Sequence, residues 1–383
     1  IKFITLYHLI FIVKIKKIMA ICLIGKNLTT LVLSKVLINK GLNVDLYYKN
    51  NKLSKNLTKT YSRTIGLSNE SINFLVDQKI LNKKKCWDIK QINLYKGDET
   101  KSFLNFKSKN NNFYMTSYND FFNSLEKRLK KNQLIKFKHI KNKKFYLKLN
   151  KKRYEIIINT DTKNPLFKKY FSNFLNKNYD SIAFTTIIKH SKIEKNNIAE
   201  QFFTKYGPLA FLPISKTKTS IVFSIFDKNL KKNRGKIKEL IMNYNRRYQI
   251  KNITDLLEFP INLSLSRNYY YKNVLSFGDA LHKIHPLAGQ GFNMTLRDTK
   301  IISNLIEKNL KLGLNFDNVL EKFENKRKSS NLVFAMGIDF IHEFFKLLNN
   351  YNLKSIDKFF SLMNNSKYIK NKLENFANKG INF

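Results

Sequence analysis

The sequence predicts an α/β protein built around a parallel β-sheet. An apolar run at 20–24, a stretch with one apolar helical face and a second apolar run at 44–48 together form a β-α-β pattern. A short apolar strand, a glycine-containing loop and a helix follow one another across 274–310, and the pattern from 318 to the end is almost wholly helical. Because a β-α-β unit aims the N-terminus of its helix at a ligand, the turn at 25–30 is the first candidate site.

Shorter patterns of apolar and turn-forming residues predict the remaining elements. We expect loops in the Asn- and Lys-rich stretches at 108–112 and 141–144. We expect further strands at 89–95, 137–139, 144–149, 154–159, 181–189, 209–213 and 220–226, and helices at 69–76, 118–130, 229–244 and 293–310.

Length and composition are those of a globular protein with a large core. Of the 383 residues, 43% are hydrophobic and 26% charged, which excludes a disordered tail, a collagen and a disulfide scaffold. This length fits about two to three domains, or one large α/β unit with an inserted second layer. Two cysteines, Cys22 and Cys86, cannot build a metal cluster or a disulfide framework, so we expect a reducing compartment and no metal.

The net charge of +44 raises the question of a nucleic-acid partner. Only nine of the 71 basic residues are arginines, and the lysines are spread along the whole chain. Proteins that read nucleic acids usually cluster arginine, whose planar fork grips phosphate and guanine. We therefore interpret the charge as a solvated surface and expect no nucleic-acid partner. The same field attracts anionic surfaces, including the inner leaflet of a membrane.

The N-terminal stretch precedes the first predicted strand. The longest apolar run there covers eleven residues, 3–13, which is too short for the ~20 residues of a membrane span. It also lacks the basic start and the cleavage site of a signal peptide. Because Met19 directly precedes the first strand, we expect 1–18 to lie outside the functional fold, with a short interfacial anchor as the alternative.

The first turn retains part of a dinucleotide fingerprint. Gly25 holds the first glycine position, while Asn27 and Thr30 occupy the third and sixth. Asparagine tolerates a left-handed backbone and threonine is small, so a binding turn is still feasible there. Tyr48 occupies the strand end where an acid would hold ribose hydroxyls. Taken alone, this element fits either a nucleotide site or an ordinary β-α-β unit.

The strongest signal lies at 274–293, where a strand delivers Gly278 and Asp279. For a flavin nucleotide, the carboxylate would accept hydrogen bonds from ribityl or ribose hydroxyls. Gly289 and Gly291 would leave room beside a flat ring, and free amides at the helix start would stabilise negative charge on a reduced flavin. The alternative is a glycine-rich turn with two buried histidines.

The run at 278–298 resembles the second FAD motif of the ubiquinone-biosynthesis hydroxylases, which are class A flavin monooxygenases. That family writes the motif GDAAHxxHPxAGQGxNxGxxD, and this chain departs from it at Leu281 and Thr295. Three other segments resemble family motifs in the same order, so the likeness spans 19 to about 380. They are 62–68 (RxxALS), 206–213 (EGPLAxLPL) and 323–331 with Asp339 (the YxxxRxxxN helix and its tail).

One middle motif differs more. The segment 161–168 aligns with the family's DGxxSxVR, which touches both the flavin and the nicotinamide donor. Asp161 is kept, while Thr162, Pro165 and Lys168 replace glycine, serine and arginine. A bulkier residue after Asp161 changes the backbone freedom of that turn.

The resemblance implies a Rossmann-like FAD-binding domain of the para-hydroxybenzoate hydroxylase fold, with an inserted, mostly antiparallel β-sheet substrate domain and a helical C-terminal segment. The implied FAD-binding domain is discontinuous (19–86, 117–175 and 266–310), the substrate domain takes 87–116 and 176–265, and the helical segment takes 311–383. The implied activity is hydroxylation of a polyprenylated phenol in ubiquinone biosynthesis. NAD(P)H would reduce FAD, and O2 would form a C4a-hydroperoxyflavin that transfers oxygen to the ring.

No side chain is obligatory for that transfer, so no catalytic residue is assigned. Arg63 matches a family arginine near the ring, with an exposed surface charge as the alternative. Pro286 and the loop from Ala288 to Gly291 would form walls beside the ring. The strand at 209–213 would line the substrate side, with plain core as the alternative. The expected cofactor-binding residues are Gly25, Asn27, Thr30, Arg63, Asp161, Gly278, Asp279, Pro286, Ala288, Gly289, Gln290, Gly291, Phe292 and Asn293, and the expected substrate-lining residues are Leu209, Phe211 and Pro213.

A hydroxylase of this kind would be cytoplasmic, with peripheral contact at the inner face of a membrane and with other quinone-biosynthesis proteins. Two alternatives remain at this point. One is a flavoprotein of the same fold that oxidises or reduces another apolar substrate. The other is a basic nucleic-acid or membrane-surface binding protein that has lost its flavin.

Overall fold

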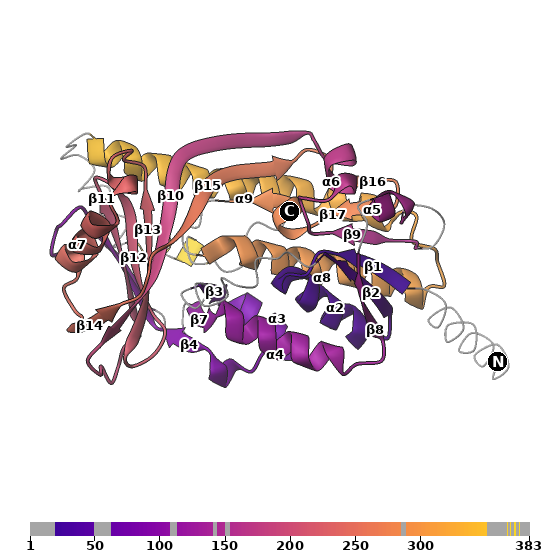
Figure 1. The fold of residues 1–383 in the computed structure, drawn as a ribbon, viewed down its shortest axis with the longest axis horizontal. Coiled ribbons are helices and arrows are strands. Elements are labelled where there is room, and N and C mark those ends of the chain that lie inside the picture. The colour runs from indigo at the N-terminus through magenta and orange to yellow at the C-terminus, as the bar shows by residue number, and fades with distance from the viewer. Residues whose placement is uncertain are drawn as a thin grey trace.

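The structure is a computed structural model that describes residues 20–49, 63–107, 113–140, 144–149, 154–284 and 289–350, with 366, 368, 371, 372 and 375. The expectation for 1–18 and those for Pro286 and Ala288 fall outside the described residues. Within the described part, two large sheets stand at opposite ends of the molecule (Figure 1).

The first sheet has six strands in the order β16-β17-β9-β1-β2-β8. All neighbours are parallel except β16, which pairs antiparallel with β17. The strands are β1 (Ala20–Ile24), β2 (Asn43–Tyr48), β8 (Ile135–His139), β9 (Ile157–Asn159), β16 (Tyr270–Tyr271) and β17 (Val274–Ser276). A parallel sheet needs helical crossovers, and these cover both of its faces.

Strand β1 shows how the sheet is sandwiched between helices. Ile21 and Leu23 pack into a cluster with α2 (Leu28–Asn39), α4 (Tyr118–Lys130) and α8 (Gln290–Lys311). Cys22 and Ile24 pack into a second cluster with α5 (Lys144–Lys148) and α6 (Pro165–Tyr170). Because successive strand residues point to opposite faces, an apolar run with no polar alternation is what a doubly covered strand requires.

The second sheet has nine strands, eight of them in the order β18-β15-β10-β13-β12-β11-β5-β6, while β14 pairs with β10. It is antiparallel except for the β11–β5 pair. Helix α7 (Arg234–Tyr244) covers one face with a core cluster. The strands are β5 (Gln91–Lys96), β6 (Leu104–Lys107), β10 (Phe174–His190), β11 (Ile198–Thr204), β12 (Gly207–Pro213), β13 (Lys218–Ile225), β14 (Ile250–Ile253), β15 (Leu257–Ser266) and β18 (His282–Lys283).

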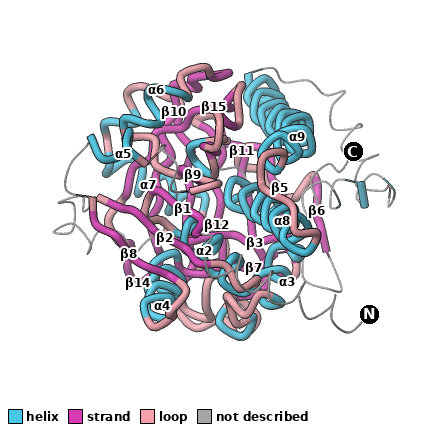
Figure 2. The backbone as a smooth tube through the Cα atoms, turned by 90° about the vertical axis from the view of Figure 1, so that its right-hand side faces the viewer, coloured by secondary structure: helices cyan, strands magenta, loops and turns pink. Residues whose placement is uncertain are grey.

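A small antiparallel sheet lies between the two, in the order β3-β7-β4. Its strands are β3 (Thr64–Ser68), β7 (Phe113–Ser117) and β4 (Trp87–Ile89), and α3 (Asn69–Asp77) follows β3. Helix α9 (Val319–Asn350) packs beside α8 and contacts β15, β16 and β11. It therefore runs along both large sheets (Figures 1 and 2).

The α/β class, the parallel opening unit and the mostly antiparallel second sheet are confirmed. Three element predictions were wrong. The stretch 144–149 is helix α5, not a strand, since buried Tyr146 and Leu149 are spaced three apart and pack under β2. The stretch 89–95 is two strands, β4 and β5, which break at Lys90 and join different sheets. The helix expected at 229–244 begins only at Arg234, after the 3-10 turn η3 (Leu230–Lys232), because Asn233 caps it.

Candidate functional site

The first turn is a tight crossing between β1 and β9. Gly25 has φ +105°, and a Cβ there would lie 2.6 Å from the Thr160 hydroxyl oxygen. Asn27 caps α2, its Oδ1 accepting from the amide of Thr30 at 3.0 Å. The Thr30 hydroxyl in turn accepts from the amide of Asn27 at 3.1 Å. Only glycine fits the first position, and the next polar residues close the helix end themselves.

The end of β9 supplies a second polar turn. The Asn159 carbonyl accepts from the amide of Phe277 at 2.8 Å, which fixes β9 against the end of β17. Asn164, which caps α6, donates to the Asn159 Oδ1 at 2.7 Å and to the Asp161 carbonyl at 2.6 Å. The Asp161 carboxylate accepts from the amide of Lys163 at 2.9 Å. Asp161 therefore lies at the same sheet edge as Gly25.

The end of β17 completes this edge. Gly278 has φ +61°, and a Cβ there would lie 2.9 Å from the Thr29 Cγ2. The hydroxyl of Ser276 donates to the Ala280 carbonyl at 2.8 Å and closes the turn η4 (Gly278–Ala280). The next side chain, Asp279, is exposed. Because the carboxyl ends of parallel strands meet at one edge, the three sequence motifs converge there.

The start of α8 is anchored to β3. Gly289, at φ +64°, brings its α-carbon so close to Gly66 that an added Cβ would lie 3.4 Å from the Gly66 nitrogen. Asn293 is fully buried, accepts from the amide of Ser68 at 3.0 Å, and donates to the carbonyls of Gly66 (3.1 Å) and Gly289 (3.2 Å). Gln290 is buried, while Gly291 and Phe292 are half-buried. Gly289 and Asn293 thus hold the start of α8 against β3.

Arg63 stands at the entrance to β3. Its guanidinium lies 4.3 Å from the ring centroid of Tyr118 and 5.9 Å from that of Phe259. The side chain is exposed, and its carbonyl accepts from the amide of Tyr118 at 3.1 Å. Stacking on two rings gives this exposed cation a defined position.

The predicted substrate-lining residues point away from this edge. Leu209 and Phe211 are buried in the cluster beneath α7, and Pro213 pairs with buried Thr219 on the same face. The opposite face of β12 carries Ala210 and Leu212, whose partner Ser220 lies 2.8 Å from the Thr64 hydroxyl of β3. Strict alternation along 209–213 separates two faces, but the sequence does not say which face meets β3.

The end of β2 carries no free acid. Tyr48 lies 5.7 Å from His139 between ring centroids, and the Lys26 ammonium lies 5.1 Å from the Tyr48 ring. Lys26 also pairs with Glu126 at 2.8 Å. Asp45, earlier on β2, already accepts from the Tyr154 hydroxyl and the Lys138 ammonium, each at 2.5 Å.

A buried ionic cluster beneath the α8 start was missed as a unit by sequence reasoning. The Asp298 carboxylate, 0% exposed, lies 2.6 Å from His282 Nε2 and 2.6 Å from Arg327 Nε. Asn331 donates to it at 3.3 Å. Burial alone would raise the pKa of Asp298. The Arg327 charge and the His282 hydrogen bond outweigh this effect, so the pKa of Asp298 lies below its usual range. Asp298 belongs to the motif at 278–298, and Arg327 and Asn331 belong to the motif at 323–331. Nothing in the sequence indicated that the two motifs are in contact.

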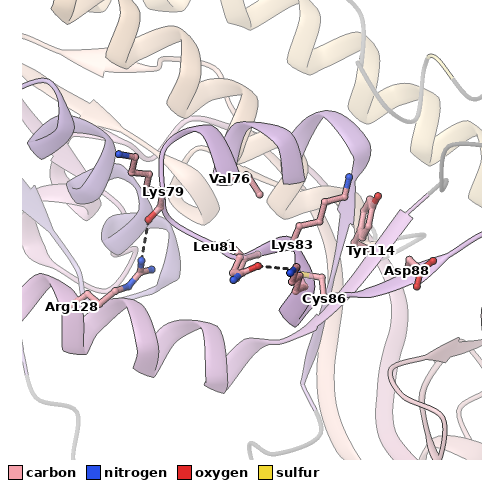
Figure 3. Close-up of a pocket in the computed structure, with 10 residues that line it drawn as sticks. Val76, Lys79, Leu81, Lys83, Cys86, Asp88, Tyr114 and Arg128 are labelled. Carbon is pink, nitrogen blue, oxygen red and sulfur yellow. Dashed lines mark hydrogen bonds between the residues drawn. The ribbon is translucent and has the colours of Figure 1, made fainter.

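A hollow of about 730 Å³ opens elsewhere, beside the end of α3, η2 (Lys83–Lys85), β4, β7 and α4 (Figure 3). Its polar side chains include Lys79, Lys83 and Arg128, and the Arg128 guanidinium donates to the Lys79 carbonyl at 3.0 Å. None of the predicted site residues lines it. Burial raises the pKa of the Cys86 thiol in its wall to about 11, so this thiol is protonated near neutrality.

The described residues hold no group of three or more His, Cys, Asp or Glu side chains arranged to bind a metal ion. Among the helices that they form, none combines the length and the apolar character needed to cross a bilayer.

Curated relatives resemble the chain over segments. Ubiquinone biosynthesis monooxygenase COQ6, mitochondrial, of Dictyostelium discoideum is 34% identical over 116 residues, which is 30% of this chain and 23% of the relative. The Schizosaccharomyces pombe protein of that name is 23% identical over 274 residues, 59% and 57% of the two chains. The Escherichia coli 3-demethoxyubiquinol 3-hydroxylase is 26% identical over 149 residues, 37% and 38%. The matched segments thus span about half the relatives' length or less.

Solved structures share the fold. The p-nitrophenol 4-monooxygenase PnpA of Pseudomonas putida superposes with a TM-score of 0.73 at 11% identity, covering 93% of this chain and 97% of that one. Klebsiella pneumoniae HpxO, solved with FAD and uric acid, gives 0.69 at 10% identity, covering 94% and 97%. The expected flavin monooxygenase fold is confirmed.

The family model of squalene epoxidase matches residues 155–359, more than half of the chain. This stretch includes β9, β17, the start of α8 and the ionic cluster around Asp298, while the relatives above confirm the expected likeness to the ubiquinone hydroxylases. The chain therefore belongs to the squalene epoxidase family.

Proposed function

We propose that the chain is an FAD-dependent, NAD(P)H- and O2-dependent monooxygenase that hydroxylates the ring of a polyprenylated phenol in ubiquinone biosynthesis. The observation that carries this proposal is the meeting of three motifs at one sheet edge, where Gly25, Asp161 and Gly278 end parallel strands. The named activities of the curated relatives support the same reaction class.

The residues present fit a flavin nucleotide best at the β17–α8 end. Gly278 has a left-handed backbone and packs closely against Thr29 of α2, and the carboxylate of the next residue, Asp279, is exposed. Gly289 lets the loop close against β3. FAD, once reduced by the nicotinamide donor, would supply the oxygen-activating chemistry.

The chain's own residues would bind and orient the cofactor and shield it from water. Asp279 would accept hydrogen bonds from ribityl hydroxyls, and the first amides of α8 would face negative charge on the ring system. Arg63, held by Tyr118, would give a polar contact at the ring edge. Asp161 would face the nicotinamide donor and the flavin. Exclusion of water from this edge would favour the transfer of activated oxygen to the substrate ring over its unproductive loss.

The substrate would lie between the cofactor edge and the second sheet. We assign its lining to Ala210 and Leu212, because their face of β12 looks toward Thr64 on β3. In this proposal the six-stranded sheet and its helices form the FAD-binding domain, and 87–116 with 176–265 form the substrate domain. A polyprenyl tail would need an apolar channel. The basic surface would hold the protein at an anionic membrane.

Flavin binding is the first test. The purified protein should be yellow and release a flavin on heating. Asp279→Ala should lower flavin occupancy at least tenfold, because a charge-assisted hydrogen bond contributes roughly 1.5–3 kcal/mol. Asp88→Ala, which removes a half-exposed carboxylate on β4, is the matched control and should keep its colour. A colourless, folded wild-type protein that binds no added FAD would refute the proposal.

Activity and membrane contact need separate experiments. Expression in cells that lack one quinone-pathway hydroxylase at a time should restore quinone in one strain, which also identifies the ring position. Flotation with anionic vesicles should recover the protein at low salt and lose it as salt rises. Absence of binding at low salt would end the membrane proposal and leave the enzymatic one standing.

A further inference from the structure

Two of the first four backbone amides of α2 are engaged by the chain's own side chains. The amides of residues 27–30 precede the first intrahelical hydrogen bond, which runs from Leu31 to the Asn27 carbonyl at 3.1 Å. The capping box engages two of these four amides, those of Asn27 and Thr30. A dinucleotide fingerprint leaves such amides free for a pyrophosphate and places a glycine where Asn27 stands.

The cap is held from a second side. The Asn27 Nδ2 donates to the Thr160 hydroxyl at 2.9 Å, and that hydroxyl donates to the Ile24 carbonyl at 2.9 Å. The backbone amide of Thr30 can only donate, so the Asn27 oxygen must face it and the nitrogen must face Thr160. The side chain is therefore fixed in the blocking orientation by β9 as well as by its own helix.

The end of β2 points the same way. Its last residue, Tyr48, presents a ring between Lys26 and His139, where a ribose-binding site would offer a carboxylate. Glu126 lies nearby but is paired with Lys26 and Lys130, each at 2.8 Å. An adenosine ribose would thus meet rings and an ion-paired cation.

We propose that Asn27 makes this chain select its cofactor through the isoalloxazine and ribityl half alone, with the ADP half of FAD adding little affinity. The inference rests on the proposed flavin function and goes beyond it in naming the residue that sets specificity. At the β17–α8 end the Asp279 carboxylate is exposed, whereas at the β1–α2 end Asn27, Thr30 and Thr160 hydrogen-bond to one another.

The test is a titration of the flavin-free protein with FAD and, separately, with riboflavin, which lacks both phosphates and the adenosine. Quenching of flavin fluorescence measures the binding of each ligand. In the wild type, FAD should bind no more than about tenfold tighter than riboflavin. Asn27→Gly should raise the affinity for FAD about tenfold, roughly the worth of one charge-assisted hydrogen bond to a freed amide. Riboflavin affinity should stay within about twofold.

The matched control is Asn233→Gly, which removes the same cap type from α7, where Asn233 accepts from the amide of Lys236 at 3.0 Å. It should change neither affinity, and both variants should melt within a few degrees of the wild type, because glycine replaces an N-cap asparagine at little cost. FAD preferred over riboflavin by a hundredfold or more, with no gain in Asn27→Gly, would overturn the inference and leave the flavin function intact. A folded protein that binds neither ligand would overturn both.

Discussion

The two ends of the candidate site are held in different ways. At the β1–α2 end, neutral groups of Asn27, Thr30 and Thr160 bond to one another across two neighbouring strands. At the β17–α8 end, the support is ionic, since buried Asp298 joins His282 on β18 to Arg327 on α9. Both ends join segments that are distant in sequence, since Thr160 follows β9 and Arg327 lies on a helix that begins more than twenty residues after Asp298.

This difference sets how each end should respond to damage. A neutral hydrogen bond contributes about 0.5–1.5 kcal/mol, and water replaces it when a group is half-exposed. When a buried charge loses its partner, water cannot take the partner's place, and the free-energy cost of desolvating that charge is no longer compensated. The β17–α8 end should therefore be the more fragile one, although its residues match the family motifs better.

The largest effect should come from breaking the buried pair. Arg327→Met keeps the apolar stem but strands the Asp298 carboxylate, so the free energy of unfolding should fall by about 3–5 kcal/mol. Urea denaturation followed by circular dichroism measures this. Lys328→Met is the matched control on the same helix, since its pair with Glu324 is exposed and contributes about 0.3–0.5 kcal/mol. Equal losses in the two variants would show that the charge of Arg327 does not hold α8 to α9.

Acid should loosen the same end by a smaller step. The pKa of Asp298 in the folded state lies below its unfolded value of about 3.9, because Arg327 and His282 outweigh burial. The unfolded chain then binds the proton first, so this stability is fully present above about pH 4 and is lost as pH falls through the folded pKa. Urea midpoints between pH 6 and 2.5 should fall more steeply for the wild type than for Asp298→Asn. Parallel profiles would remove Asp298 from acid sensitivity.

Sequence reasoning reached the elements that local pattern determines. The apolar run of β1, the helix after it and the turn at Gly278 each follow from neighbours within a few residues. Sequence reasoning considered a left-handed backbone at Asn27, whereas its backbone is extended and its side chain caps α2. The ionic cluster could not be found, since His282, Asp298 and Arg327 are joined only by how α8 packs on α9. The face of β12 that meets β3 could not be chosen from sequence for a related reason: alternation defines two faces, and only the contact between Ser220 and Thr64 says which one meets β3.

A substitution at Gly278 tests the β17–α8 end without changing any charge. Gly278→Ala forces a left-handed backbone on alanine, about 1–2 kcal/mol, and sets a Cβ 2.9 Å from Thr29. We expect a loss of about 2–3 kcal/mol in stability together with weaker flavin binding. Gly97→Ala, at φ +54° with nothing near, carries the backbone cost alone and should lose about 1 kcal/mol without affecting flavin. Thr29→Ser should relieve only the steric part in Gly278→Ala, and no relief would place the cost entirely in the backbone.

The smallest effect should come from the neutral end. Thr160→Val keeps the side-chain shape but removes the hydrogen bond from Asn27, and the Ile24 carbonyl still accepts from the amide of Thr160 at 2.9 Å. The expected loss is about 1 kcal/mol, since Asn27 is half-buried and water can reach its nitrogen. Combined with Arg327→Met, the two losses should add to within about 0.5 kcal/mol, because the two ends share no partner. A coupling above about 1 kcal/mol would mean that the cap on α2 senses the ionic cluster, most directly through Thr29 against Gly278, and the two ends would then act as one unit.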